Sequence, residues 1–180
     1  MINAMKKGLV HIYTGDGKGK TTASLGLAFR GIGCGLRVNM IQFLKTWDTG
    51  EVACAKRLSE QFKIWNFESK HGFINEMNEV QKAKLQLEIN KAMEFAKECA
   101  LNGESDILIL DEIFGAVSNG MVSTEQILEL IILKAENTEL VLTGRNAPEC
   151  IVEAADYVSK IDMIKHPYEQ GIGPRKGIEF

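Results

Sequence analysis

The sequence has few cysteines and histidines, and neither type is clustered. Its four cysteines, Cys34, Cys54, Cys99 and Cys150, form no C-x-x-C pair, and its three histidines are far apart. This spacing argues against a zinc site and favours reduced thiols. The chain also lacks internal repeats, low-complexity segments and linker-like stretches, so we expect residues 1–180 to form one domain.

Long apolar runs and an excess of one charge are also missing. No apolar run approaches the roughly 18 residues of a membrane span, and residues 1–8 have no signal-peptide core. We therefore expect no membrane association and a cytoplasmic location. The net charge of −3 gives no electrostatic case for binding nucleic acid. Hydrophobic residues make up 45% of the chain, which is ordinary for a globular protein with a full core.

Apolar runs that suit strands alternate with segments of helical periodicity along the whole chain. Strands are predicted at residues 9–13, 37–44, 62–67, 106–110, 139–142 and 157–164, and helices at 23–33, 52–61, 79–101, 123–134 and 148–155. Such alternation predicts an α/β fold with a mostly parallel sheet and helices on both faces. The glycine-rich tail at 165–180 is expected to be either a flap over the site or a loose end.

A glycine-rich segment between the first strand and the first helix organises the chain. Strand, glycine-rich turn, Lys-Thr and helix is the order of phosphate-binding loops, where backbone N–H groups and a helix N-terminus surround phosphate oxygens. We expect Lys20 to contact phosphate and the Thr21 hydroxyl to bind the magnesium ion that accompanies a nucleotide. The predicted nucleotide-binding residues of the loop are Gly15, Asp16, Gly17, Lys18, Gly19, Lys20, Thr21 and Thr22.

The loop is one residue shorter than the usual G-x-x-x-x-G-K-[ST] pattern. Counting back from Gly19, the first glycine belongs at position 14, which is Thr14, and the glycine comes one residue later at Gly15. A shorter loop offers fewer N–H groups in a different arc, so we expect phosphate binding with an altered phosphate order. A Gly-Lys-rich surface turn is the alternative. As a loop side chain, Lys20 is expected to be exposed and to pack against nothing.

An acidic pair, Asp111 and Glu112, follows four consecutive apolar residues. The apolar run is typical of a strand buried on both faces. Carboxylates at the C-terminal end of such a strand, downstream of a phosphate loop, are typical of a Walker B motif that holds magnesium directly or through water. The alternative is a carboxylate that caps the next turn.

Arg145 follows the strand predicted at 139–142, on the ligand side of the sheet, and is a candidate to neutralise phosphate charge. A surface ion pair is the alternative for this arginine. These motifs together predict binding of a nucleoside triphosphate with magnesium, but they do not define a reaction. The sequence has no kinase H-R-D loop and no Ser-His-Asp pattern.

Over nearly its whole length, the sequence resembles the ATP:corrinoid adenosyltransferases. These are cobalamin adenosyltransferases with a RecA-like P-loop fold. The most specific match is the family's short loop T-G-x-G-K-G-K-T-T, which corresponds to residues 14–22. The other matching segments are Gln42-Phe43-Leu44-Lys45, Leu110-Asp111-Glu112, Leu142-Thr143-Gly144-Arg145, Lys165-His166-Pro167-Tyr168 with Gly171, and Gly177-Ile178-Glu179-Phe180.

The resemblance implies an enzyme of cobalamin biosynthesis. It would move the adenosyl group of ATP to the cobalt(I) of a reduced corrinoid, cobalamin or cobinamide, and release triphosphate. The nucleotide would lie reversed in the loop, and the cobalt nucleophile would need no protein base. Lys20 and Arg145 would be the catalytic residues. Thr21, Asp111 and Glu112 would hold Mg²⁺ or Mn²⁺.

The resemblance also suggests where the corrinoid and other partners would bind. Phe73, Gln42 and Phe43 are the expected corrinoid contacts, with packing into the core as the alternative for Phe73. Family members often carry a G-F-x-W stretch, and residues 72–75 keep its phenylalanine without its tryptophan. A flavoprotein reductant and a homodimer are implied too. The competing predictions are an ATP hydrolase or phosphotransferase on the same fold, and a non-catalytic nucleotide-dependent binding module.

Overall fold

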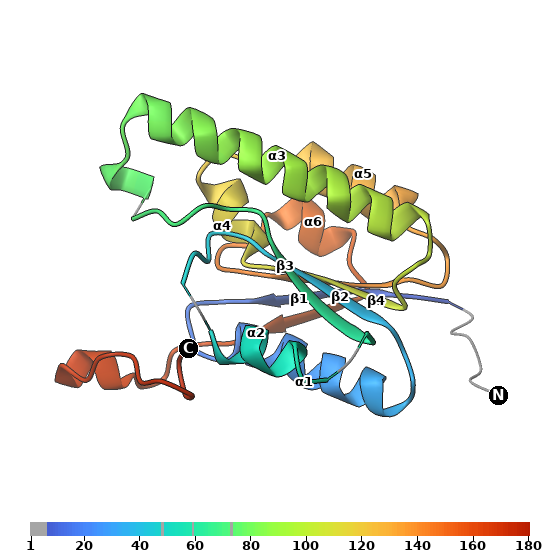
Figure 1. The fold of residues 1–180 in the computed structure, drawn as a ribbon, viewed down its shortest axis with the longest axis horizontal. Coiled ribbons are helices and arrows are strands. Elements are labelled where there is room, and N and C mark those ends of the chain that lie inside the picture. Colours follow the sequence, from blue (N-terminus) through green and yellow to red (C-terminus); the bar gives the residue numbers. More distant parts are fainter. Residues whose placement is uncertain (1–6, 48, 59, 73) are drawn as a thin grey trace.

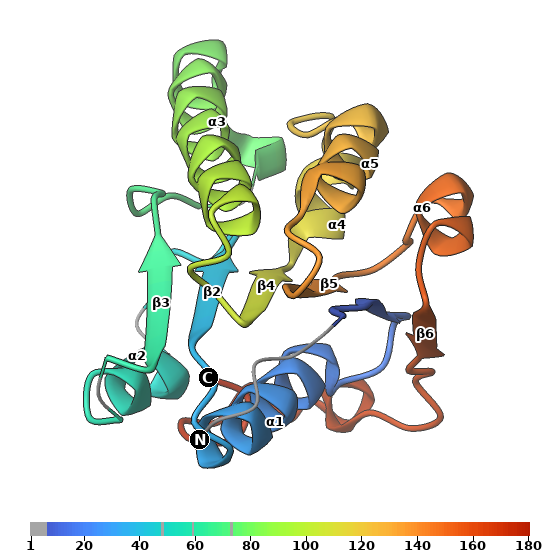
Figure 2. The same ribbon diagram turned by 90° about the vertical axis from the view of Figure 1, so that its right-hand side faces the viewer.

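Six strands form one sheet in this computed structural model, which describes residues 7–47, 49–58, 60–72 and 74–180. The strand order is β3-β2-β4-β5-β1-β6, and every neighbouring pair is parallel (Figure 2). The sheet is therefore parallel throughout, as the alternation predicted. The strands are β1 (Val10–Thr14), β2 (Val38–Gln42), β3 (Phe62–Asn66), β4 (Ile107–Asp111), β5 (Glu139–Thr143) and β6 (Tyr157–Lys160).

Helices cover both faces of this sheet (Figure 1). One face carries α1 (Lys20–Gly33) and α2 (Gly50–Ala55), and the other carries α3 (Glu79–Leu101), α4 (Ile113–Ser118), α5 (Thr124–Leu133) and α6 (Glu149–Glu153). Two 3-10 turns, Ile74–Glu76 and Pro167–Gln170, lie in the connections. Within the described ranges, no helix combines the length and the apolar character needed to cross a bilayer.

The sheet separates the core into two clusters, and alternate residues of strand β4 face each of them. Ile107 and Ile109 pack on the α1 and α2 side, whereas Leu108 and Leu110 face the larger cluster under α3 to α6. All five residues of β4 are buried. The uninterrupted apolar run follows from this position, because a strand covered on both faces has no solvent side to make polar.

Local sequence signals placed most elements correctly. Helix α3 spans the predicted 79–101, and the helix predicted at 123–134 forms as α5, which begins with a capping box of Ser123 and Gln126. Three strands end earlier than predicted, and for β3 the difference is the single residue after Asn66. β2 stops at Gln42 because Leu44 adopts a left-handed φ of 56°. β6 stops at Lys160 because its neighbour β1 ends at Thr14 and turns into the glycine-rich loop, which leaves later residues without a strand partner.

Because all strands are parallel, their carboxyl ends meet at one edge of the sheet, where ligands of open α/β folds bind. The glycine-rich loop after β1 and the turns after β2, β4 and β5 all lie there. The C-terminal segment also returns to this edge, since residues 177–180 line a cavity together with α1 and α2 (Figure 1). Of the two expectations for the tail, its last residues adopt the flap arrangement.

Candidate active site

The glycine-rich loop between β1 and α1 depends on backbone conformations that glycine adopts easily. Gly15 and Gly19 have φ angles of 103° and 129°, in the region that side chains disfavour. A Cβ on Gly15 would lie 2.4 Å from the carbonyl oxygen of Ile161. The N–H of Gly17 donates to that same carbonyl at 2.8 Å. The loop is thus packed against the chain that follows β6, and its shape is fixed by tertiary contacts.

The side chain of Lys20, the first residue of α1, lies inside this loop. Its Nζ donates to the carbonyl oxygens of Gly15 at 2.7 Å and Gly17 at 2.9 Å, and the residue is only 9% exposed. The expectation of an exposed lysine was therefore wrong, because the short loop wraps around the side chain. Burial lowers the pKa of Lys20, and the positive charge of Arg145 lowers it further, while nearby carboxylates oppose the shift.

A cavity of about 300 Å³ opens from the loop. Residues 16–22 line it, so the loop residues predicted to bind phosphate face a common space, with Gly15 contributing its carbonyl to Lys20. Its other walls are Glu112, Arg145, His166, Ile178 and Glu179. The cavity combines backbone N–H groups, the start of α1 and three cationic side chains, which is the chemistry that binds a polyphosphate.

Arg145 reaches the mouth of this cavity from the end of β5. Gly144 has a φ of 140°, and a Cβ there would come within 2.8 Å of Phe114, so the chain turns sharply before the arginine. The exposed guanidinium Nε lies 3.9 Å from Oδ1 of Asp16. Arg145 thus forms the loose surface ion pair of one sequence-based alternative and also lines the cavity, while its role toward phosphate stays a prediction.

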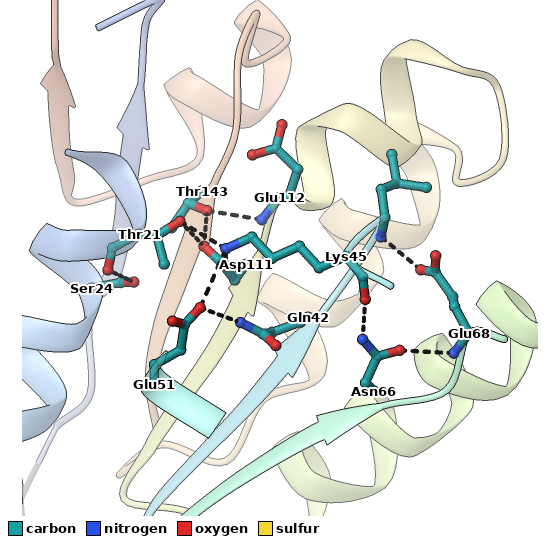
Figure 3. A network of polar contacts seen from close by, with 11 residues as sticks. Thr21, Ser24, Gln42, Lys45, Glu51, Asn66, Glu68, Asp111, Glu112 and Thr143 are labelled. Atoms are coloured by element: carbon teal, nitrogen blue, oxygen red, sulfur yellow. Dashed lines mark hydrogen bonds and ion pairs between the residues drawn. The ribbon is translucent and has the colours of Figure 1, made fainter. Parts of the chain in front are cut away.

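Asp111 is the buried centre of a polar network at the ends of three strands (Figure 3). The carboxylate is fully buried, and its Oδ1 accepts hydrogen bonds from the hydroxyls of Thr21 at 2.9 Å and Thr143 at 2.8 Å. Thr143 was not among the predicted site residues. Its position at the end of β5, beside β4 in the sheet, could be recognised only once the strand order was known.

Glu112 follows directly with a left-handed φ of 61°. Its N–H donates to the Thr143 hydroxyl at 2.9 Å, and its carboxylate points away from the cluster around Asp111 (Figure 3). Burial raises the pKa of Glu112, and the negative charge of Asp111 raises it further. Glu112 occupies the N-cap position of α4, but its side chain makes no capping hydrogen bond and lines the loop cavity.

A lysine that the sequence-based site omitted completes the network. The Nζ of Lys45 lies 2.5 Å from Oδ2 of Asp111, 3.1 Å from the hydroxyl of Thr21 and 3.8 Å from Oε1 of Glu51 (Figure 3). Lys45 and Glu51 belong to the polar segment that follows β2. That position at the carboxyl end of a strand was the signal that could have identified them.

The oxygen atoms of Thr21, Asp111 and Glu112 suit a hard divalent cation such as Mg²⁺. Asp111 and Thr21 are in contact, whereas the Glu112 carboxylate is turned toward the loop cavity. Within the described part of the chain, no group of three His, Cys, Asp or Glu residues forms a dedicated metal cage. Such a partial set fits Mg²⁺, which commonly takes one or two carboxylates and completes its shell with phosphates and water.

The residues expected to contact a corrinoid occupy different environments. Phe43 is fully buried in the larger core cluster. Gln42 is 2% exposed, and its amide donates to Glu51 at 3.0 Å. Phe73 lies outside the described residues. Their corrinoid contact stays a prediction.

A second cavity, of about 470 Å³, lies between α1, α2 and the C-terminal segment. Thr21 and Thr22 line both cavities, and so do Ile178 and Glu179, so the two spaces are neighbours with shared walls. The wall also holds the hydroxyl of Thr49, which is buried and has no hydrogen-bond partner among the described residues. The volume is in the range of roughly 300–1,000 Å³ typical of small-molecule sites.

A parallel α/β sheet with a lysine-bearing glycine loop facing a buried carboxylate defines a P-loop nucleotide-binding protein. A solved structure supports this fold. The chain superimposes on a KaiC-like protein of Pyrococcus horikoshii with a TM-score of 0.53 and 16% identity, covering 89% of this chain and 75% of that one.

The family follows from the sequence comparisons. Residues 6–180 match the family described as ATP:corrinoid adenosyltransferase BtuR/CobO/CobP, and the chain belongs to this family. A corrinoid adenosyltransferase of a Sinorhizobium species is 35% identical over 97% of this chain and 81% of its own length. A corrinoid adenosyltransferase of Pseudomonas aeruginosa is 30% identical over 97% of this chain and 85% of its own length. Another, from Salmonella typhimurium, is 28% identical over 97% of this chain and 87% of its own length. The resemblance inferred from the motifs is confirmed.

Proposed function

We propose that this member of the ATP:corrinoid adenosyltransferase family transfers the adenosyl group of ATP to the cobalt(I) of a reduced corrinoid and releases triphosphate. Cobalt(I) would supply the electron pair of the new cobalt–carbon bond. Triphosphate would leave with the electron pair of the C5′–O5′ bond. The observation that carries the proposal is the family match over residues 6–180, which includes the shortened loop.

The loop cavity is where the triphosphate would bind. Its negative charge increases as the C5′–O5′ bond breaks, so cations fixed nearby stabilise the transition state more than the ground state. Lys20 is held in the loop by two carbonyl oxygens and would be positioned without a large movement. Lys18 and Arg145 line the same cavity and would add positive charge at its mouth.

A bound Mg²⁺ or Mn²⁺ would neutralise further phosphate charge. Thr21 and Asp111 would hold it, with Glu112 contributing from the loop side. The 2.9 Å hydrogen bond from the Thr21 hydroxyl to the buried Asp111 carboxylate supports this assignment. Thr143 would position both acidic residues, because its hydroxyl donates to Asp111 and accepts the N–H of Glu112.

The second cavity would receive the adenosyl end of the nucleotide. Its shared walls with the loop cavity support one ligand that extends through both. The Thr49 hydroxyl, which has no partner in the described part of the chain, would be available to a polar group of the ligand. The corrinoid would have to approach this cavity for cobalt to reach C5′. Contacts with Phe73, Gln42 and Phe43, a flavoprotein reductant, a homodimer and a cytoplasmic location remain proposals from the family resemblance.

The test is an assay with protein, ATP, Mg²⁺, a strong reductant and cobinamide or cobalamin, followed by the corrin spectrum. A light-sensitive alkyl-cobalt product with stoichiometric triphosphate is expected. ADP and phosphate formed independently of a corrinoid would instead indicate a hydrolase, the alternative that family membership disfavours. Nucleotide binding without turnover would contradict the proposal as well.

A further inference from the structure

The ammonium of Lys45 lies where a divalent cation would bind. Its three oxygen neighbours, Oδ2 of Asp111, Oγ1 of Thr21 and Oε1 of Glu51, are 2.5, 3.1 and 3.8 Å away. We call the space that they bound the cation position. Two of these groups belong to the set that would hold Mg²⁺, so Lys45 and the metal would compete for the same oxygen atoms.

We propose that Lys45 is an internal counter-cation that occupies the cation position in the nucleotide-free protein and is displaced when metal and nucleotide bind together. This inference rests on the proposed metal role of Thr21 and Asp111. Its consequence is that free divalent metal binds weakly, because it must first displace an ammonium paired with a buried carboxylate. Metal that arrives with a triphosphate gains phosphate ligands and additional charge, which favour the displacement.

The backbone around Lys45 is built to direct it toward the cation position. Leu44, just before it, has a left-handed φ of 56°, a conformation that costs free energy for a leucine. The Leu44 N–H donates to Glu68 at 2.7 Å, and the Asn66 amide donates to the Lys45 carbonyl (Figure 3). The strained backbone at Leu44 is thus held by Asn66, the last residue of β3, and by Glu68 just after it. Strain maintained in this way argues for a specific role of the lysine.

Glu51 gives the displaced ammonium a place to go. Its carboxylate is mostly buried, lies 3.8 Å from Nζ and accepts a hydrogen bond from Gln42 at 3.0 Å. A small movement of the flexible lysine side chain toward Glu51 would free Asp111 without exposing an unpaired buried charge. Gln42 would then act as a positioning residue that holds Glu51 ready.

The experiment measures Mn²⁺ affinity by electron paramagnetic resonance, with and without ATP. Wild type should bind Mn²⁺ weakly alone and much more tightly with ATP. Lys45→Met should bind Mn²⁺ alone about tenfold more tightly or better, because an opposing charge within a few ångströms is removed. Lys45→Arg keeps the charge and should remain weak. Unchanged Mn²⁺ affinity in Lys45→Met would overturn the proposal.

Lys134→Met is the matched control. Lys134 is also partly buried and hydrogen-bonded, with Nζ 2.7 Å from the Gly8 carbonyl, but it lies away from the cation position. Its Mn²⁺ affinity should equal that of wild type. If Lys45→Met does not fold alone, Mn²⁺ should restore its cooperative thermal unfolding, because the metal replaces the missing cation. Failure of that rescue would also overturn the proposal.

Asp111→Asn separates this inference from the proposed function. If the metal site is correct, Asp111→Asn weakens Mn²⁺ binding in the presence of ATP, whatever Lys45 does. If Asp111→Asn has no effect, the metal assignment itself is wrong. If Asp111→Asn weakens Mn²⁺ binding but Lys45→Met leaves it unchanged, the metal site stands and the counter-cation role fails.

Discussion

The hydroxyl of Thr21 donates a 2.9 Å hydrogen bond to the carboxylate of Asp111, although the two residues are 90 positions apart in the chain. Thr21 lies in the first turn of α1 and Asp111 at the end of β4, and β5 separates β4 from the loop-bearing strand β1. Thr143 at the end of β5 donates to the same carboxylate oxygen. One buried oxygen atom thus joins the phosphate loop to the acidic motif.

Thr143→Val should reduce both stability and turnover. The substitution leaves the Glu112 N–H without its acceptor and removes one donor to Asp111, at a cost of about 1–3 kcal/mol in the free energy of unfolding. Thr143→Ser keeps the hydroxyl and should retain most activity. Urea unfolding measures the loss of stability, and turnover together with ATP-dependent Mn²⁺ affinity measures the effect on the site.

The control for Thr143 is Thr138→Val. Thr138 is equally buried and also donates a hydrogen bond, to the Ser105 carbonyl at 3.0 Å, but it precedes β5 at the opposite edge of the sheet. It should lose stability to a similar extent without losing Mn²⁺ affinity. Equal loss of affinity in both variants would mean that Thr143 acts only through stability.

Lys20→Met should lower turnover by about 100-fold or more, because the role proposed for Lys20 is to stabilise the charge that develops on the triphosphate. Stability should change little, because the loss of the two hydrogen bonds from Nζ to the Gly15 and Gly17 carbonyls opposes the gain from no longer burying a charge. Burial lowers the pKa of Lys20 below its ordinary value of 10.5, so the charged form costs stability at neutral pH, and this cost is relieved as pH rises from the lowered pKa to 10.5. Methionine fills a similar volume. A clear drop in melting temperature with activity retained would reverse the assignment.

Glu112→Gln should stabilise the protein at pH 7 while impairing metal-dependent turnover. The pKa of Glu112 is raised above its ordinary value of 4.5, mainly by burial, so the folded state binds the proton more tightly than the unfolded state. The ionised group therefore costs stability above its folded pKa, and the cost vanishes below about pH 4.5, where both states are protonated. Urea unfolding at pH 7 and pH 4 should show the gain only at pH 7.

Glu125→Gln should change stability in the opposite direction to Glu112→Gln. Glu125 lies in the first turn of α5, and hydrogen bonds from the backbone and from Ser123 and Thr124 lower its pKa. Its charge therefore contributes stability above the unfolded pKa, which is lost as pH falls. The substitution should destabilise the protein slightly at pH 7. A stabilising effect of the same sign in both variants would contradict the explanation from burial.

Gly15→Ala should disrupt the loop. A methyl group would lie 2.4 Å from the Ile161 carbonyl at a φ of 103°, so we expect a cost of about 2–4 kcal/mol. Gly120→Ala is the matched control, because Gly120 also has a positive φ but no atom within 4 Å of an added Cβ. It should cost about 1 kcal/mol through the backbone alone. Thermal unfolding with and without ATP compares them, and only Gly15→Ala should lose stabilisation by ATP.

The sequence determined the elements whose causes are local. The four apolar residues before Asp111 required a strand covered on both faces, and Ser123 with Gln126 began a helix through contacts three residues apart. The loop motif and the acidic pair could be recognised in the sequence for the same reason, because each consists of adjacent residues. The parallel sheet followed from the alternation, because parallel strands need crossover helices.

Only the tertiary structure decided which distant side chains share the site. Lys45 reaches Asp111 across 66 positions and Thr143 reaches it across 32, through a strand order that no local pattern specifies. The burial of Lys20 depends on the chain after β6 packing against Gly15 and Gly17, which closes the loop around the lysine. These contacts depend on the order and spacing of the packed strands. They therefore form only when the whole sheet is folded.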